Sequence, residues 1–207
     1  MVKNNFEPIF SQEMILYSSL KPEDGKYRDL EFNISFFEER FIEEFNGCRF
    51  NHVRFGGDLK KIRFIDCYFM NCDLSNIDLS QCYFYRVHFE QCKGTGGRYR
   101  KSKFKYTTFS KCQFSLTDFS ESQFESIRIL DSNFSESAFQ SCQQIDFKTN
   151  NVDFSESDFT ETPLTKIDFS KCTINGLRLS PHHLKGCCVN PQQALGLVQL
   201  MGIIIKE

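Results

Sequence analysis

The sequence predicts an all-β solenoid, in which the chain winds into stacked coils. The main observation is a large apolar residue at every fifth position from Leu59 to Val189. Of the 27 positions in this series, 24 are large and apolar, and the exceptions are Gly94, Gln144 and Thr149. A short repeat of fixed period is typical of proteins that stack similar units in one direction.

A second series, mostly of small residues, lies two positions before the first, as at Cys72, Thr117 and Ser137. Residues two apart point the same way in an extended chain, so each pentad turns one large and one small side chain inward. The alternation restarts every five residues, and the chain must therefore turn about once per pentad. A period of five does not fit the 3.6-residue turn of an α-helix, which excludes helix through this stretch.

These pentads resemble the pentapeptide-repeat family, whose motif is a small residue, Asp or Asn, Leu or Phe, and two polar residues. Clear matches are Cys72–Asn76, Thr117–Glu121 and Ser157–Glu161. The resemblance covers about residues 27–189. It implies a right-handed, four-sided β-helix that places four pentads, one on each side, in every coil, with about eight coils in all.

Outside the repeat, residues 1–26 form an irregular or capping segment, in which Gln12–Leu20 is compatible with a short helix. The register of the repeat shifts within Glu38–Glu44 and again at Gly56–Gly57. Two interruptions follow. At the first, Gly94 and Gly97 occupy inward positions, which indicates either a missing core side chain (a missing rung of the ladder) or a small loop. At the second, Gln144 and Thr149 occupy inward positions while Ile145 and Phe147 offer a competing register, which indicates a bulge or a short projecting loop.

The chain has ten cysteines, most of them in the small inward series, so we interpret them as small core residues and not as disulfides or metal ligands. We expect no cofactor and no metal.

The four histidines lie near no Ser or Cys arrangement typical of catalysis, and His182 falls in an inward position of the repeat. We therefore predict that the chain is not an enzyme. With no bilayer-spanning apolar run and no signal-peptide pattern, we expect a cytoplasmic location.

Residues 190–207 form a C-terminal tail. Asn190 is a favourable N-cap and Pro191 a favourable first helical residue, so a helix is predicted over Gln192–Met201, ending at Gly202. The helix is apolar nearly all round, and one face can cap the last coil while the rest needs a partner. We therefore predict a homodimer. Its interface residues are Leu195, Leu197, Val198, Leu200, Met201, Ile203, Ile204 and Ile205.

The runs Leu179–Gly186 and Val189–Ala194 narrow the resemblance, because they are similar to the C-terminus of Qnr-type quinolone-resistance proteins of the Gram-positive branch. That resemblance implies a dimer through the tail. It also implies binding to DNA gyrase and topoisomerase IV, with protection from fluoroquinolones, by mimicry of duplex DNA. The alternative is a protein-interaction scaffold on the same β-helix that has no topoisomerase partner.

Net charge is only −2, but the charges are segregated. Residues 49–112 carry 13 bases and 5 acids, and residues 113–162 carry 10 acids and 2 bases. With four pentads in each coil, seven acids fall on two adjacent faces, which predicts a partner-binding acidic strip of Asp118, Glu121, Glu136, Asp153, Glu156, Asp158 and Glu161. The basic stretch from Arg98 to Lys111 is split over several faces, so direct nucleic-acid binding is not expected.

Overall fold

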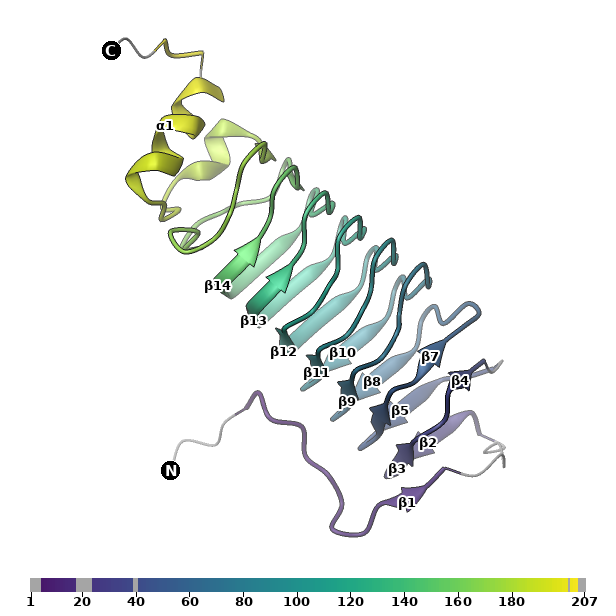
Figure 1. Ribbon diagram of the computed structural model, residues 1–207. Coiled ribbons are helices and arrows are strands. Elements are labelled where there is room, and N and C mark those ends of the chain that lie inside the picture. The colour runs from purple at the N-terminus through teal and green to yellow at the C-terminus, as the bar shows by residue number, and fades with distance from the viewer. Residues whose placement is uncertain (1–4, 18–23, 39–40, 201, 205–207) are drawn as a thin grey trace.

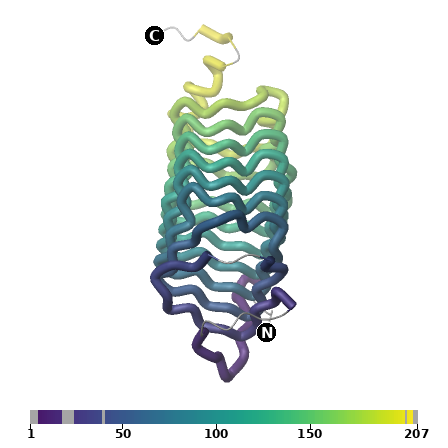
Figure 2. The backbone as a smooth tube through the Cα atoms, turned by 90° about the vertical axis from the view of Figure 1, so that its right-hand side faces the viewer, coloured from purple at the N-terminus to yellow at the C-terminus, as the bar shows by residue number. Residues whose placement is uncertain are grey.

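The computed structural model describes residues 5–17, 24–38, 41–200 and 202–204. It is a rod of about eight stacked coils with one α-helix at its C-terminal end (Figures 1 and 2). The all-β solenoid expected from the five-residue period is confirmed. Neither helix that the structure describes has the length and the apolar run needed to cross a membrane.

The strands are short in the first coils and longer toward the middle of the rod. They are β1 (Ile15–Leu16), β2 (Lys26–Arg28), β3 (Leu30–Phe32), β4 (Phe36–Phe37), β5 (Glu44–Asn46), β6 (Arg49–Asn51), β7 (Arg54–Phe55), β8 (Arg63–Ile65), β9 (Tyr68–Met70), β10 (Tyr83–Tyr85), β11 (His88–Glu90), β12 (Lys103–Ser110), β13 (Gln123–Asn133), β14 (Gln143–Asp153), β15 (Asp158–Phe159) and β16 (Arg178–Leu179). Two helices follow, the 3-10 helix η1 (Pro181–Leu184) and α1 (Pro191–Leu200).

Every strand pairs in parallel with an equivalent strand of a neighbouring coil. In β8, β10 and β12 the partners are Phe64, Phe84 and Phe104, so that each step along the rod is four pentads. The first coils are shorter, since the steps from Tyr27 to its partner Phe45, and from Phe45 to its partner Phe64, fall just short of four pentads. The predicted register change at Gly56–Gly57 is confirmed. Residue 54, before it, bridges residue 73, whereas residue 58, after it, bridges residue 78 and so begins the full spacing.

The corners of the coils use left-handed backbone at nearly every fifth residue. Gln81, Arg86 and Gln91, for example, have φ of 61°, 52° and 53°. This conformation costs an L-residue roughly 1–2 kcal/mol. Local hydrogen bonds offset part of that cost; at one corner the Asp118 carboxylate accepts the Ser120 N–H at 2.9 Å.

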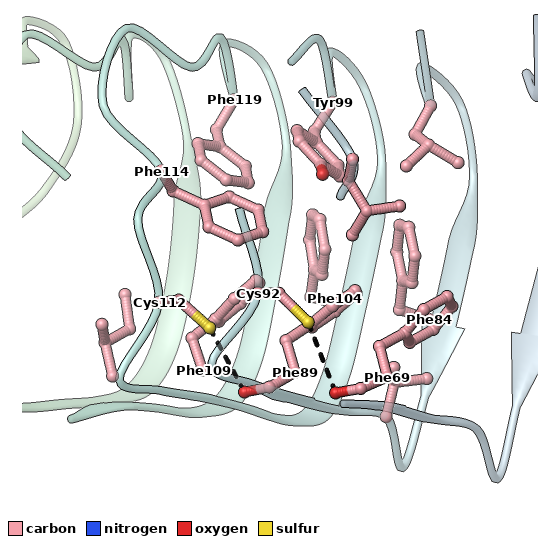
Figure 3. Close-up of a cluster of buried hydrophobic side chains, with 14 of the residues drawn as sticks. Phe69, Phe84, Phe89, Cys92, Tyr99, Phe104, Phe109, Cys112, Phe114 and Phe119 are labelled. Carbon is pink, nitrogen blue, oxygen red and sulfur yellow. Dashed lines mark hydrogen bonds between the residues drawn. The ribbon is translucent and has the colours of Figure 1, made fainter. Parts of the chain in front are cut away.

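The core consists of aromatic ladders, with one rung from each coil. The rings of Phe84 and Phe104 stack with centroids 4.6 Å apart and an interplanar angle of 3°. In the small inward series most Cys and Ser side chains also donate a hydrogen bond to the preceding coil. The Cys112 thiol reaches the Phe89 carbonyl at 3.4 Å (Figure 3), and the Ser102 hydroxyl reaches the Leu79 carbonyl at 2.9 Å. Cys and Ser are therefore equivalent there, being small inward donors.

The cysteines behave as the sequence predicts. All ten are free thiols, and seven of them are buried in the core. Burial raises the pKa of the Cys82 and Cys142 thiols to about 12, so these thiols stay protonated and can donate their hydrogen bonds at neutral pH. Cys172 and Cys187 are half-buried, and Cys188 is exposed.

At the first interruption a rung is missing and the coil stays continuous. Lys93 bridges both neighbouring coils, and the Gly94 N–H donates to the Gln113 carbonyl at 2.7 Å. A Cβ on Gly94 would lie 2.6 Å from the Phe114 ring, so this ring occupies the space that a side chain would need. Of the two alternatives for Gly94 and Gly97, the missing rung is correct and no loop projects there.

The bulge or loop expected at Gln144 and Thr149 is wrong, because both residues lie within β14, which pairs with β13 at the regular four-pentad spacing. The competing residue Phe147 enters the small inward position and is 4% exposed. Gln144 and Thr149 instead turn toward the next coil. The Gln144 amide donates to the carbonyls of Pro163 and Thr165 at 3.1 and 3.0 Å, and the Thr149 hydroxyl to that of Asp168 at 2.6 Å.

These side-chain bonds span a break in the backbone ladder. Between β14 and residues 163–170, all of which the structure describes, no backbone hydrogen bond forms. One reason is that Pro163 has no N–H, whereas its equivalent Gln143 donates to the Ser122 carbonyl at 3.0 Å. The second is the aromatic ring of Phe147, which stands in the column that the adjacent coils fill with Ile127 and Ile167. We call this break the seam.

The N-terminal segment does not form the predicted helix over its described part, residues 12–17; residues 18–20 lie outside the described residues. Ile15 and Leu16 form β1, which pairs with β3 at the start of the stack. Upstream of β1 the chain runs back along the outside of the coils. There Phe6 packs against Tyr106 at 5.8 Å and under the Arg128 guanidinium at 3.7 Å, and the Ile9 N–H donates to Asp66 at 2.9 Å.

The predicted start of the C-terminal helix is confirmed. The Asn190 side chain accepts the Gln193 N–H at 2.9 Å, and the Gln193 side chain accepts the Asn190 N–H at 2.8 Å, which together form a capping box. The Gln193 amide also donates to the carbonyls of Phe169 and Cys172. The first turn of α1 is thus tied to the coil below it.

Candidate functional site

The four-pentad register brings the predicted acids together by columns. Successive bridges connect residues 118, 138 and 158 on one face. Glu136 and Glu156 occupy equivalent left-handed corners of successive coils, with φ of 56° and 58°. Glu121 and Glu161 share another corner column, but two coils apart, because Ser141 stands between them.

Basic side chains neutralise part of this strip. The Arg100 guanidinium bridges Asp118 at 3.1 Å and Glu121 at 3.0 Å, and Lys101 also reaches Glu121 at 3.4 Å. From the sequence, Arg100 and Lys101 belong to the basic stretch and were not expected to pair with the acidic strip. The sequence signal for the pairing is that each base precedes its acid by about the length of one coil.

Asp158 is the most enclosed acid of the strip. It accepts hydrogen bonds from the Gln140 amide at 2.7 Å and the Thr160 N–H at 2.9 Å, and it lies 3.6 Å from the Arg178 guanidinium. Burial alone would raise the pKa of Asp158, but the bonds from Thr160 and Gln140 and the charge of Arg178 outweigh it and lower that pKa. Asp158 is therefore ionised but compensated, and only 9% exposed.

Three acids have no ion pair to their carboxylates among the described residues: Glu136, Asp153 and Glu156. The Arg178 guanidinium reaches only the backbone carbonyl of Glu156, at 3.5 Å. The two glutamates are exposed. The Asp153 carboxylate accepts only the N–H and the hydroxyl of Ser155, at 2.9 and 2.6 Å. We call these three residues the acidic corner. It is the part of the predicted strip that carries uncompensated negative charge.

Glu161 belongs to a different group of side chains. Its carboxylate accepts the Ser180 hydroxyl at 2.8 Å and lies 3.6 Å from Nε2 of His183. The Ser180 hydrogen bond, followed by the charges of His182 and His183, lowers the pKa of Glu161. The expectation that His182 points inward is wrong, because its side chain is exposed in the short helix η1.

The tail leaves apolar side chains exposed. Leu195 is 55% exposed and Ile204 is 84% exposed, whereas Leu197 packs against the core. A groove of about 840 Å³ runs between α1 and the last coil, where Leu177, Leu179 and Leu200 line it with polar neighbours such as Gln193. Of the predicted interface residues, Met201 and Ile205 lie outside the described residues.

The basic stretch offers no free stacking surface in the described chain. Tyr106, the aromatic residue that the sequence leaves available to stack on a base, contacts Phe6 and Tyr85. Arg98 pairs with Asp78 at 3.1 Å, and Lys105 pairs with Glu125 at 2.5 Å.

Comparison with known proteins returns the same repeat. Residues 43–115 and 62–139 match the pentapeptide repeat region model. A trypsin-treated variant of QnrB1, a plasmid-mediated fluoroquinolone resistance protein, is 18% identical at a TM-score of 0.44, with 88% of this chain and 100% of that chain covered. HetL, a pentapeptide repeat protein involved in heterocyst differentiation regulation from the cyanobacterium Nostoc sp. strain PCC 7120, is 12% identical at a TM-score of 0.23, with 82% and 90% covered. No curated protein matches the chain in sequence.

Proposed function

Because this chain is a pentapeptide-repeat protein, with a rod filled by its own side chains, we propose that it acts by binding a protein partner and not by catalysis. We propose further that the partner is a type II topoisomerase, DNA gyrase or topoisomerase IV, in the cytoplasm. Binding would protect that enzyme from fluoroquinolones or from a natural topoisomerase poison. The similarity of the runs Leu179–Gly186 and Val189–Ala194 to the Qnr tail supports this choice.

The observation that carries the proposal is the acidic corner. Glu136 and Glu156 lie one coil apart, which is about 4.8 Å along the rod at strand spacing. Phosphates of one DNA strand recur at about 3.4 Å along the helix axis. A row of uncompensated carboxylates on a rigid rod therefore approximates one edge of DNA over a short length, and a basic DNA-binding surface would attract it.

The paired acids favour the second candidate, a scaffold with no topoisomerase partner. Asp118, Glu121 and Asp158 are held by Arg100, Lys101 and Arg178, so the DNA-like charge is confined to a small part of the rod. A scaffold requires no such charge. The two candidates differ in whether reversing the acidic corner changes topoisomerase activity.

A gyrase supercoiling assay with ciprofloxacin separates them. The unmodified protein should restore supercoiling as its concentration rises, and the double variant E136K/E156K should lose that protection. The matched control is D131K/D146K, which makes the same charge change at left-handed corners with φ of 48° and 56° in other columns. Lysine is tolerated at such corners, as at Lys101 and Lys111. No protection by the unmodified protein would favour the scaffold; equal loss in both doubles would refute the acidic corner as the contact.

We also propose that the exposed apolar residues of the tail join two copies of the chain. Leu195, Leu200 and Ile204 are all more than half exposed, and the groove beside α1 could receive the tail of a second copy. Light scattering at micromolar concentration should give twice the chain mass. The variant L195D/I204D should give the mass of one chain, while a monomer before substitution would refute this proposal.

A further inference from the structure

Two coils meet at the C-terminal end through a group of metal-ligating side chains. Glu161 stands at a left-handed corner, and His182 and His183 belong to η1, one coil further on. The ligand atoms of the three side chains all lie within 4.8 Å of one another. His183 Nε2 lies 3.6 Å from Glu161 Oε2, and the two imidazole centroids are 4.0 Å apart.

Neighbouring groups hold the carboxylate in a defined orientation. The Ser180 hydroxyl, on a residue only 8% exposed, donates to Oε1 of Glu161 at 2.8 Å and accepts the Glu161 N–H at 3.2 Å. Oε1 is thus occupied, and Oε2 is the oxygen that faces His183. Hydrogen bonds of this kind orient metal ligands in proteins and raise metal affinity.

The backbone beneath the histidines is also fixed. The His183 N–H donates to the Ser180 carbonyl at 2.9 Å, and the His183 carbonyl accepts the Leu164 N–H at 3.0 Å from the preceding coil. Pro181 begins the short helix and restricts its entry. Binding an ion would therefore require side-chain rotation rather than a rearrangement of the coil.

We propose that Glu161, His182 and His183 form a site for a divalent first-row transition ion, with Zn²⁺ as the best fit. Two imidazoles and one carboxylate are a common zinc set that leaves a fourth position to water. Imidazole suits Zn²⁺ better than Mg²⁺ or Ca²⁺, which prefer all-oxygen sites. All three side chains are exposed or half-buried, so the site is open to an ion from solution.

The position of the site suggests its role. It joins η1 to the preceding coil close to the seam, where backbone bonds between β14 and residues 163–170 are absent from the described structure. A bound ion would add a bridge between two coils beside the place where the backbone ladder is interrupted. It would also hold Ser180 and η1 in place just before α1 begins.

The test is a Zn²⁺ titration of the full chain by calorimetry, after treatment with a chelator and under reducing conditions. We expect one ion per chain and a higher melting temperature with Zn²⁺ present. E161Q, which keeps an acceptor for Ser180, and H182A should each weaken binding at least tenfold. S180A tests the positioning residue, which touches no ion, and should weaken it by roughly tenfold. Circular dichroism of the ion-free variants checks that each folds.

Two controls separate this site from others on the chain. H52A removes a histidine at a distant corner, where its ring contacts Asn51, and should bind Zn²⁺ normally. C187S/C188S removes the two accessible neighbouring thiols and should also bind normally. In addition, Co²⁺ bound by Glu161 and the histidines should show no thiolate charge-transfer band.

The proposal is overturned by an absence of Zn²⁺ binding at micromolar concentration. It is equally overturned if H182A and H183Q keep the original affinity, or if the cysteine double variant loses it. These outcomes do not depend on whether the protein binds a topoisomerase.

Discussion

The middle coils and the coils beyond the seam use the same residue types but are held together differently. In the middle, Phe84, Phe104 and Phe124 stack ring over ring, and their backbones pair in β10, β12 and β13. In the coil just after the seam Leu164 and Phe169 are as fully buried, yet side chains of Gln144 and Thr149 make the hydrogen bonds to that coil across the seam. Burial of an apolar column is therefore not sufficient for a backbone ladder.

The difference shows what the ladder requires. Ile127 in β13 shows that a branched residue in the inner position still permits pairing with both neighbouring coils. The seam differs because the larger ring of Phe147 stands in that column and because Pro163 has no N–H to donate. One large residue and one proline are enough to replace backbone bonds by side-chain bonds over one side of the rod.

The largest contrast should come from truncating a core side chain to alanine in each region. Phe104 is 1% exposed and stacks between Phe84 and Phe124, so F104A should lower the free energy of unfolding by about 3–5 kcal/mol. L184A, in the last coil, removes a half-buried side chain and should cost clearly less. Urea unfolding of both variants measures the difference. Equal losses would mean that the two regions are packed equally well.

The seam can be weakened directly with Q144A. The variant loses two hydrogen bonds to the carbonyls of Pro163 and Thr165 and should destabilise residues 163–170 locally by about 1–2 kcal/mol. Hydrogen exchange by mass spectrometry should then show faster exchange there and no change in β10 or β12. Q143A, next to it on an exposed position of the same strand, is the matched control. Faster exchange in the control as well would assign the effect to β14 itself.

The middle coils contain one imperfect rung that can be improved. The Tyr99 hydroxyl is the buried side-chain polar atom that has no hydrogen-bond partner among the described residues. Y99F removes this hydroxyl from a position 0% exposed and should raise the free energy of unfolding by about 1 kcal/mol. Thermal unfolding measures this, and a lower melting temperature would show that the hydroxyl has a partner in solution.

The smallest expected effect is the pH dependence of the inter-coil ion pairs. For Asp78 and Asp158, burial raises the pKa, but hydrogen bonds from Ser80 and Thr160 and nearby basic groups lower it overall. Their stabilisation is complete above about pH 4, the unfolded value, and is lost as pH falls through the lower folded values. D158N should thus be less stable than the unmodified chain at pH 7, and the gap should narrow below pH 4. A constant gap from pH 7 to pH 2 would exclude this linkage.

Sequence periodicity predicted the ladders correctly because burial requires an apolar residue at each inward position, whatever its neighbours. It also predicted the free core cysteines and the N-cap at Asn190. It failed at Gln144 and Thr149, where polar residues in inward positions indicated a loop. There the strand persists because β13 pairs with it, and this pairing is a contact between coils.

The candidate site was predicted less completely for the same reason. The columns of acids followed from the four-pentad coil, but their partners Arg100 and Arg178 lie on neighbouring coils, and the sequence pattern did not predict these ion pairs. Likewise, Glu161 and His183 are more than a full coil apart along the chain, and only the stacking of the coils brings them to 3.6 Å.

The amino-acid sequence by itself determined the solenoid and the side chains that fill it, since a five-residue period of apolar residues fits neither an α-helix nor a straight strand. The coil length followed from the resemblance of the pentads to the pentapeptide-repeat family. The tertiary structure decided which charges remain uncompensated, where the ladder stops at the seam, and which side chains meet at Glu161. Those properties depend on distances between successive coils, and such distances are set by packing and backbone pairing rather than by the order of residues within one coil.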